Sequence, residues 1–271
     1  MPELPEVETV RRALIKKLRN KKILDIKIIY SNIFENQDIK EIEKNIKNQT
    51  INDIERRGKW LIFCLDDYYL LSHLRMEGKY IFKMLNAPLE KHEHVIFIFE
   101  DQELRYKDTR KFGRMYLLEK NELYNSPLKK LGYEPWDKNL DVNYLKEKLK
   151  NKKLPIKTLL LDQSLITGIG NIYADEILFL SKINPHRIGS SLTDEELENI
   201  INNTKKVLEQ AIKDGGTTIR SYTSLDNKIG SHQNNLFVHK KENEKCPVCR
   251  SLIKKDRING RSSYYCSKCQ K

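Results

Sequence analysis

Two pairs of cysteines near the end of the chain constrain its fold more than any other feature. Cys246 and Cys249 form one C-x-x-C pair, Cys266 and Cys269 form a second, and sixteen residues separate the two pairs. Each C-x-x-C turn places two sulfur atoms on one side of a metal ion, so this spacing predicts a four-thiolate zinc site with a hairpin between the pairs. Four protein ligands leave no open coordination position. We therefore expect one structural zinc ion rather than a catalytic one.

Redox pairing or disulfide formation is the alternative use of these cysteines, and a cytosolic setting disfavours it. We expect a cytoplasmic protein, because no apolar run approaches the length of a membrane span and no signal-peptide apolar segment begins the sequence. The remaining cysteine, Cys64, stands alone in an apolar run. It is expected to be a small buried side chain.

The balance of charge predicts a polyanionic partner, with nucleic acid as the leading candidate. Lys and Arg number 50 against 38 Asp and Glu, which gives a net charge of +12 and a pI of about 9.3. A general enrichment in lysine would also raise this total, so local clustering is more informative. Residues 240–271 carry ten Lys or Arg and three acids. Arg261 lies in the turn of the expected zinc hairpin, where its side chain can enter a groove of nucleic acid.

The first half of the chain has the pattern of a helix followed by strands. Val7, Val10, Leu14 and Leu18 recur at helical spacing and predict an amphipathic helix over residues 6–18. Successive strands without long intervening helices favour an antiparallel sandwich or barrel. Short β-branched and aromatic runs predict these strands at 26–28, 60–65, 68–71, 80–84, 95–99 and 115–118, with one short helix over 39–46.

Helical patterns dominate the second half. A break at 131–136 precedes a lysine-rich segment, where we expect a basic hinge. Between two of the expected helices stands Gly168-Ile169-Gly170-Asn171. Its glycines would let backbone N–H groups approach a phosphate, with the positive end of the next helix behind them, although an ordinary helix–helix turn explains them equally well. The helices are expected at 142–149, 156–161, 172–180 and 194–213.

The start of the chain carries a candidate catalytic group. Removal of Met1 would leave Pro2 with a secondary amine at the N-terminus. Such α-amino groups titrate near about 8, so many are unprotonated at neutral pH and can form Schiff bases with electrophilic carbon. Glu3 could pass protons to and from the same centre. Taken alone, these residues favour the alternative of a plain helix entry, because Pro and Glu are common at helix starts.

In combination, these motifs resemble the bacterial formamidopyrimidine-DNA glycosylases, members of a superfamily shared with endonuclease VIII. The resemblance is carried by Pro2-Glu3-Leu4-Pro5-Glu6-Val7-Glu8-Thr9, the Gly168–Asn171 hairpin and the terminal cysteine hairpin, and it covers essentially the whole chain. It implies an α+β multidomain fold. The implied parts are an N-terminal antiparallel β-sandwich with a leading helix (the catalytic domain, 1–134), a basic hinge (135–152), a helix-two-turn-helix DNA-binding domain with a lesion loop (153–235) and a zinc finger with a β-hairpin (236–271).

The resemblance also implies a base-excision-repair enzyme that is both a DNA glycosylase and an AP lyase. It would act as a monomer on double-stranded DNA that contains 8-oxoguanine or formamidopyrimidines. Pro2 would attack C1′ of the damaged nucleoside, and Glu3 would serve the proton transfers. Lys59 matches a lysine near the lesion phosphate that donates a proton in β-elimination. Arg261 matches the zinc-finger arginine that binds phosphate and is assigned to δ-elimination.

Further residues match DNA contacts of that family: Asn171, His92, Arg110 and Lys152. Met76, Arg110 and Phe112 match the trio that fills the void left by an extruded base, a task that suits a thioether, a guanidinium and an aromatic wedge. Without the resemblance, Met76 and Phe112 would be interpreted as core residues, Arg110 as a surface charge and Lys59 as a strand lysine. The extruded base is expected to meet the loop after Gly215-Gly216, including Thr217, Thr218 and Tyr222.

Two residues depart from the family pattern. Arg75 stands where the family often has Gly, and Thr109 stands where it often has Pro. Two other functions stay open: an endonuclease-VIII-like enzyme for oxidised pyrimidines, and a non-catalytic zinc-finger protein that binds damaged DNA. Leu4 and the Arg110/Phe112 pair favour the purine-specific branch. The presence of Pro2, Glu3 and Lys59 argues against a non-catalytic binder, which would need none of them.

Overall fold

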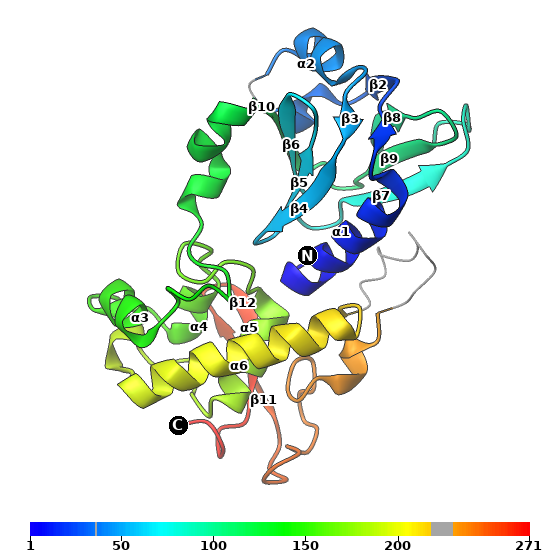
Figure 1. The fold of residues 1–271 in the computed structure, drawn as a ribbon. Helices are drawn as coiled ribbons and strands as arrows, with labels where there is room; N and C mark the ends of the chain where they lie inside the picture. Colours follow the sequence, from blue (N-terminus) through cyan, green and yellow to red (C-terminus); the bar gives the residue numbers. More distant parts are fainter. Residues whose placement is uncertain (36, 218–229) are drawn as a thin grey trace. The chain divides into compact units, whose positions relative to one another are not determined.

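The computed structural model describes residues 1–35, 37–217 and 230–271, and it separates into two compact units (Figure 1). The first unit comprises Met1–Lys129 together with Thr217–Gly230. The second comprises Lys130–Gly216 and Ser231–Lys271. Within the described ranges, no helix has the length and apolar character needed to cross a bilayer.

The first unit is an antiparallel β-sandwich, as predicted, with two sheets of four strands each. One sheet has the order β10 (Arg114–Glu119), β6 (Tyr68–His73), β5 (Trp60–Cys64), β4 (Asp53–Arg57). The other has the order β2 (Asp25–Ile28), β8 (Glu93–Ile98), β9 (Glu103–Lys107), β7 (Lys79–Lys83). A separate two-stranded ladder joins β1 (Lys21–Lys22) to β3 (Thr50–Ile51).

The leading helix α1 (Leu4–Leu18) packs against β4 and β5. Its predicted apolar stripe is buried and joins one hydrophobic core with inward residues of both sheets, among them Phe63, Phe97 and Tyr106. Burial of this stripe fixes α1, because an amphipathic helix gains most of its stability from packing. The short helix α2 (Ile39–Ile46) has the predicted bounds and is capped by the Asp38 carboxylate, which accepts from the Lys40 N–H at 2.8 Å.

Two strands of the sandwich, β4 and β9, have no counterpart among the predicted strands. Charged residues interrupt their apolar pattern, and β9 even buries Arg105, which is 1% exposed. The Arg105 guanidinium lies 2.6 Å from the Glu93 carboxylate of the neighbouring strand β8, and it also pairs with Glu103. A buried charge is tolerated only when it is paired and hydrogen-bonded. A single-sequence pattern does not reveal that partner.

The second unit combines helices with a terminal β-hairpin. The predicted helices are confirmed as α3 (Val142–Leu149), α4 (Ile156–Leu160), α5 (Asn171–Leu180) and α6 (Asp194–Lys213). The Thr193 hydroxyl caps α6 by accepting from the Glu196 N–H, while the Glu196 carboxylate accepts from the Thr193 N–H. The long helix α6 lies beside α3 and α5 (Figure 1). Short 3-10 turns complete the chain at Ser31–Ile33, Lys120–Asn125, Pro127–Lys130, Gly189–Ser191 and His232–Asn235.

The terminal hairpin pairs β11 (Lys254–Ile258) with β12 (Arg261–Tyr265) through the two-residue turn Asn259-Gly260. Both turn residues have positive φ, 44° and 75°, which is the backbone that favours Asn-Gly in tight hairpins. The base of the hairpin packs against Phe179 of α5 in a small core with Val238 and Ile253. The zinc-finger segment is therefore packed on the helices of its own unit.

Candidate active site and nucleic-acid interface

The N-terminal segment is buried at the start of α1. Pro2 is buried, and Glu3 is only 3% exposed at the N-cap position of the helix. The Glu3 N–H donates to Oε2 of Glu6 at 2.8 Å, one half of a capping box that closes the first turn. This contact fixes the backbone on which Pro2 stands. Pro2 and Glu3 therefore do form a helix entry, as the alternative interpretation of the sequence had it. The same helix start holds the candidate nucleophile, Pro2, in a fixed position.

The surroundings of the N-terminal amine favour its unprotonated form. Burial lowers the pKa of the Met1 amino group, and this effect outweighs the opposing attraction of Glu3 and Glu6. Lys59 acts on the same amine and lowers its pKa further. An amine with a lowered pKa is more often unprotonated at physiological pH, and it is therefore a better nucleophile. The structure therefore brings the N-terminus, Glu3 and Lys59 into one electrostatic neighbourhood.

Lys59 occupies the two-residue connection between β4 and β5 and is 4% exposed. Its neighbour Gly58 accepts a hydrogen bond at its carbonyl from the Arg56 guanidinium at 3.0 Å. Arg56 in turn lies 3.2 Å from the Glu8 carboxylate of α1. This chain of contacts ties the lysine-bearing turn to the helix that follows Pro2.

Glu6 connects the N-terminal segment to a residue more than two hundred positions away. Its Oε1 accepts from the Thr217 N–H at 2.9 Å and from the Thr217 hydroxyl at 3.1 Å, while its Oε2 accepts from Glu3. Our interpretation of the sequence gave Glu6 no such role, although the Glu3-x-x-Glu6 spacing of a capping box was visible in it. Thr217 is buried and anchors the start of the expected lesion loop. The other two expected base contacts, Thr218 and Tyr222, lie outside the described residues.

The candidate void-filling residues stand on two loops of the sandwich. Met76 is half-buried in the loop between β6 and β7, whereas Arg110 and Phe112 are exposed in the loop between β9 and β10. The Arg110 guanidinium lies over the Phe112 ring, 4.6 Å from its centroid. The Asp108 carboxylate holds this second loop by accepting from the N–H groups of Arg110, Phe112 and Gly113 at 2.8 to 3.0 Å.

The side chain of Tyr106 lies against both loops. Its hydroxyl oxygen would lie 2.0 Å from a Cβ atom added to Gly78 and 1.8 Å from one added to Gly113. Gly78 closes the Met76 loop and Gly113 closes the Arg110 loop. Real Cβ atoms essentially never approach that closely, so Tyr106 excludes a side chain at both positions, and at Gly78 the Leu74 carbonyl oxygen, 2.6 Å from the added atom, excludes it as well. Both glycines belong to the loop motifs that the sequence shows, but nothing in the sequence indicates that Tyr106 lies next to both of them.

Two histidines flank these loops. The His92 carbonyl accepts from the Asp108 N–H at 3.0 Å, which places His92 beside the Arg110 loop. His73 is buried, and its Nδ1 accepts from the Arg75 N–H at 3.0 Å. Burial, reinforced by the charges of Arg75 and Lys59, lowers the pKa of His73 to about 3. His73 is therefore neutral at physiological pH and holds the backbone just before Met76.

In the second unit, the turn before α5 is held by the Gln163 side chain. Its Oε1 accepts from the Gly168 N–H at 2.9 Å, and its Nε2 donates to the Ile169 carbonyl at 2.9 Å. Asn171, the first residue of α5, donates through Nδ2 to the Ser262 carbonyl at 3.0 Å. Its Oδ1 is buried and finds no hydrogen-bond partner within the described chain. The predicted phosphate contact thus stands at a helix N-terminus and against the zinc hairpin.

Arg261 is the exposed first residue of β12, directly before Ser262. The Ser262 carbonyl also accepts from Nζ of Lys157 at 2.8 Å, and this buried ammonium lies 2.7 Å from the Asp175 carboxylate. The structure therefore brings Asn171 and Arg261 together in the second unit. Lys152 is exposed after the end of α3.

The sulfur atoms of Cys246, Cys249, Cys266 and Cys269 all lie within 4.8 Å of one another. Two of the separations are 3.8 Å and 3.4 Å. Tetrahedral zinc with Zn–S bonds of about 2.3 Å requires sulfur atoms roughly 3.8 Å apart, so the cluster fits one zinc ion. All four positions are protein thiolates, which makes the site structural.

Three family models match the chain. The formamidopyrimidine-DNA glycosylase N-terminal domain matches residues 1–115, the formamidopyrimidine-DNA glycosylase H2TH domain matches residues 131–223, and a zinc finger found in FPG and IleRS matches residues 243–271. These three ranges follow the β-sandwich, the helices and the terminal hairpin.

Named relatives and solved structures agree with the family models. Formamidopyrimidine-DNA glycosylase of Bacillus cereus is 47% identical and that of Ligilactobacillus salivarius 45% identical, each over 100% of this chain and 99% of the relative. A Lactococcus lactis Fpg variant in complex with DNA containing Fapy-dG superimposes with a TM-score of 0.94 at 42% identity, and covers 100% of both chains. Lactococcus lactis Fpg in complex with DNA containing an abasic site gives 0.94 at 41% identity over 99% of each chain. The chain therefore belongs to the formamidopyrimidine-DNA glycosylase family.

Proposed function

We propose that this protein is a bifunctional DNA glycosylase and AP lyase that removes oxidised purines, 8-oxoguanine and formamidopyrimidines, from duplex DNA. The observation that carries the proposal is the position of Pro2, buried at the start of α1 next to the buried Glu3, where burial and Lys59 both lower the pKa of the adjoining Met1 amine. Its relatives are named formamidopyrimidine-DNA glycosylase, and a Lactococcus lactis Fpg variant has been solved on DNA that contains Fapy-dG, which supports the proposal.

After removal of Met1, the Pro2 nitrogen attacks C1′ of the damaged nucleotide. The bond between C1′ and the base breaks, and the base leaves with a proton that Glu3 helps to deliver. Opening of the sugar ring gives a Schiff base between Pro2 and C1′. Loss of a C2′ proton then expels the 3′ phosphate, with Lys59 as the proton donor, and a second elimination assisted by Arg261 expels the 5′ phosphate.

The remaining assignments concern how DNA is held. We assign phosphate or backbone contacts to Asn171, His92, Lys152 and Arg110, and the filling of the void to Met76, Arg110 and Phe112. Support comes from the exposed Arg110 and Phe112 on a loop held by Asp108, and from Asn171 at the N-terminus of α5, where backbone N–H groups favour anions. Thr217, Thr218 and Tyr222 are assigned to the extruded base.

Zinc supplies no chemistry in this mechanism. Bound by its four cysteines, it holds the β11–β12 hairpin that presents Arg261. We also retain the division into a catalytic domain (1–134), a basic hinge (135–152), a DNA-binding domain (153–235) and a zinc finger (236–271). A cytoplasmic, nucleoid-associated location follows from DNA as the substrate.

Borohydride trapping tests the proposal. Duplexes carrying 8-oxoguanine are incubated with zinc-loaded protein and sodium borohydride, and the cross-linked peptide is mapped by mass spectrometry. We expect a covalent adduct at Pro2 and cleavage on both sides of the sugar. A duplex carrying thymine glycol, run in parallel, distinguishes an enzyme for oxidised pyrimidines.

Protein that carries an uncleaved N-terminal extension is the matched control, because its Pro2 nitrogen is an amide. It should bind the damaged duplex and yield no adduct. If correctly processed protein also yields no adduct, the lyase mechanism is wrong, and a damage-binding protein becomes the better interpretation.

A further inference from the structure

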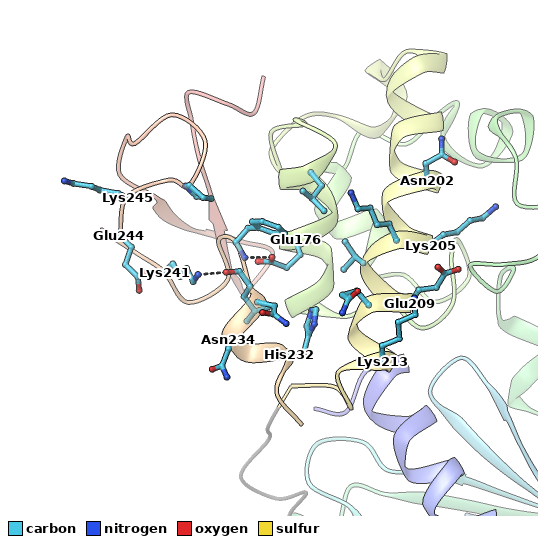
Figure 2. A pocket seen from close by; sticks show the side chains of 18 residues that line it. Glu176, Asn202, Lys205, Glu209, Lys213, His232, Asn234, Lys241, Glu244 and Lys245 are labelled. Atoms are coloured by element: carbon cyan, nitrogen blue, oxygen red, sulfur yellow. Dashed lines mark hydrogen bonds between the residues drawn. The ribbon is translucent and has the colours of Figure 1, made fainter. Parts of the chain in front are cut away.

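A groove of about 870 Å³ lies in the second unit, and none of the residues that line it is assigned to DNA (Figure 2). Helix α6 forms one wall, and the segment from His232 to Pro247 forms the other. Its volume is in the range of cavities that bind specific ligands. The excision mechanism uses none of the residues that line it.

The rim of the groove is rich in lysine. Lys205, Glu209 and Lys213 project from α6 at helical spacing, and Lys241, Glu244 and Lys245 come from the facing segment (Figure 2). Lys206 adds a further ammonium on the α6 side. The rim therefore presents positive charge from both walls.

Most of the lysines on the rim have no ion-pair partner within the described chain. Lys205, Lys206, Lys213 and Lys245 form no ion pair with any residue that the structure describes. The three acids of the lining offset only part of the charge of its five lysines, which leaves a formal net charge of +2. Glu176 is buried and accepts from the N–H groups of residues 237–239 at 2.6 to 3.0 Å, Glu209 accepts from Nε1 of Trp136 at 2.8 Å, and Glu244 is exposed at the rim.

The inner surface between the lysines is apolar. Leu180, Val207, Leu236, Phe237 and Pro247 contribute to it. Phe237 is 39% exposed, and its ring stacks on Phe179 with centroids 5.7 Å apart. Because Glu176 holds the backbone of residues 237–239, this wall is preformed and does not have to order upon binding.

The groove is separate from the candidate phosphate contacts of the same unit. Asn171 begins α5 and contacts the zinc hairpin, whereas Leu180, which lines the groove, ends the same helix. A ten-residue helix spans about 15 Å, so the two surfaces lie at opposite ends of α5. Binding in the groove does not require displacement of DNA from Asn171 or Arg261.

We infer that this groove docks an acidic segment of a partner protein, one in which aliphatic or aromatic side chains alternate with carboxylates. Carboxylates would pair with the lysines of the rim, and the apolar side chains would cover Leu180 and Phe237. A DNA duplex presents phosphates on its convex outer surface and keeps its apolar thymine methyls inside the major groove, so it does not fill the apolar hollow. A small free anion would find few fixed donors, because His232 and the amides of Gln210 and Asn235 are already paired with Asp214.

Fluorescence anisotropy with a labelled eight-residue peptide that alternates Asp with Leu and Phe tests this inference on the intact, zinc-loaded protein. Two peptide controls replace Asp with Asn, or Leu and Phe with Ala. We expect each control peptide to bind at least about tenfold more weakly than the parent. These peptide controls test the charged contacts and the apolar contacts separately, and they leave the protein itself unchanged.

On the protein side, Lys205→Glu/Lys213→Glu should weaken parent-peptide binding at least about tenfold. The matched control is Lys40→Glu/Lys44→Glu on α2, which changes the net charge equally and leaves the groove intact. Both variants should retain excision activity and the wild-type melting temperature. Equal loss with the α2 variant, or equal binding of the Ala-substituted peptide, would reduce the effect to general charge attraction and overturn the inference. An undamaged duplex could also compete with the peptide for the groove. If it does, and if Lys205→Glu/Lys213→Glu abolishes duplex binding there, the groove binds DNA instead of a partner protein.

Discussion

The hydroxyl oxygen of Tyr106 lies 1.8 Å from the position that a Cβ atom on Gly113 would occupy. A single buried side chain thus determines how closely the loop that carries Arg110 and Phe112 can approach the sandwich. The same oxygen restricts Gly78 at the end of the Met76 loop. The two candidate void-filling loops therefore rest on one common support.

Gly113→Ala is expected to destabilise the protein by about 1 to 3 kcal/mol, the usual cost of forcing an extra carbon into a packed site. It should also slow base excision, because the loop must shift. Tyr106→Phe removes the nearest atom and leaves ring Cζ 2.8 Å from the added carbon, so the double variant should be less destabilised than the sum of the two single variants. Denaturant unfolding of the four proteins measures this coupling. Strict additivity would show that the Tyr106 hydroxyl does not restrain Gly113.

Glu6→Gln should disturb the N-terminal segment and the start of the lesion loop together. Glu6 accepts hydrogen bonds at both carboxylate oxygens, from Glu3 on one and from Thr217 on the other. A glutamine has only one acceptor oxygen, so one of these ends loses its bond. We expect single-turnover excision of 8-oxoguanine to fall about tenfold, which corresponds to about 1.4 kcal/mol, close to the lower end of the range for a hydrogen bond to a charged group.

The control for Glu6→Gln is Glu41→Gln, an equivalent change on the exposed first turn of α2. Cleavage of a preformed abasic site should be less affected than base excision if Thr217 serves the extruded base. An equal loss on both substrates would place the effect of Glu6 on Pro2 alone.

The buried His73 predicts a loss of stability in mild acid. Its pKa is lowered from 6.5 to about 3 in the folded protein, so the unfolded chain binds a proton that the folded protein does not. Its contribution is fully present above pH 6.5 and is lost as the pH falls from there towards 3, at up to about 1.4 kcal/mol per pH unit. Unfolding free energies of wild type and His73→Gln, measured from pH 7 to pH 5, should diverge in slope. Parallel curves would mean that His73 titrates alike in both states.

Arg75→Gly should stabilise the chain. Arg75 has a φ of 52°, a left-handed backbone that costs a non-glycine residue about 1 to 2 kcal/mol. Glycine relieves this strain but gains about 0.5 to 1 kcal/mol of entropy in the unfolded chain, so a net gain of about 0.5 to 1 kcal/mol is expected. Thermal unfolding measures it. Excision opposite cytosine and adenine, compared in both proteins, tests whether the arginine charge beside Met76 affects opposite-base discrimination; identical ratios would exclude such a role.

Removal of zinc should disrupt the second unit selectively. The cysteines belong to the small core that packs the hairpin on Phe179, so a chelator or Cys249→Ala should release the metal, lower the melting temperature of that unit and weaken DNA binding. Cys64→Ser is the control, because Cys64 is not one of the four clustered cysteines. Cys64 is half-buried rather than fully buried as expected, and this partial burial raises the pKa of its thiol to about 12 and keeps it neutral. Retained zinc and DNA binding in Cys249→Ala would contradict the four-thiolate assignment.

Elements with a clear apolar period were predictable from the sequence. Helices α2 and α3 have the expected bounds, and the cysteine pairs converge as their spacing required. Strand β9 was missed because its stability depends on Arg105 finding Glu93 on another strand. The Glu6–Thr217 and Tyr106–Gly113 contacts were missed for the same reason, since each depends on residues that only the folded chain brings together.

The junction between α5 and the zinc hairpin rests on the main-chain carbonyl of residue 262, which accepts from both Lys157 and Asn171. The Ser262 side chain is exposed and takes no part in these two bonds. Almost any amino acid at position 262 would supply the same acceptor. Substitution of Ser262 therefore leaves the attachment of the hairpin to α5 intact. This surface position can vary during evolution while the alignment of Asn171 with Arg261 stays unchanged.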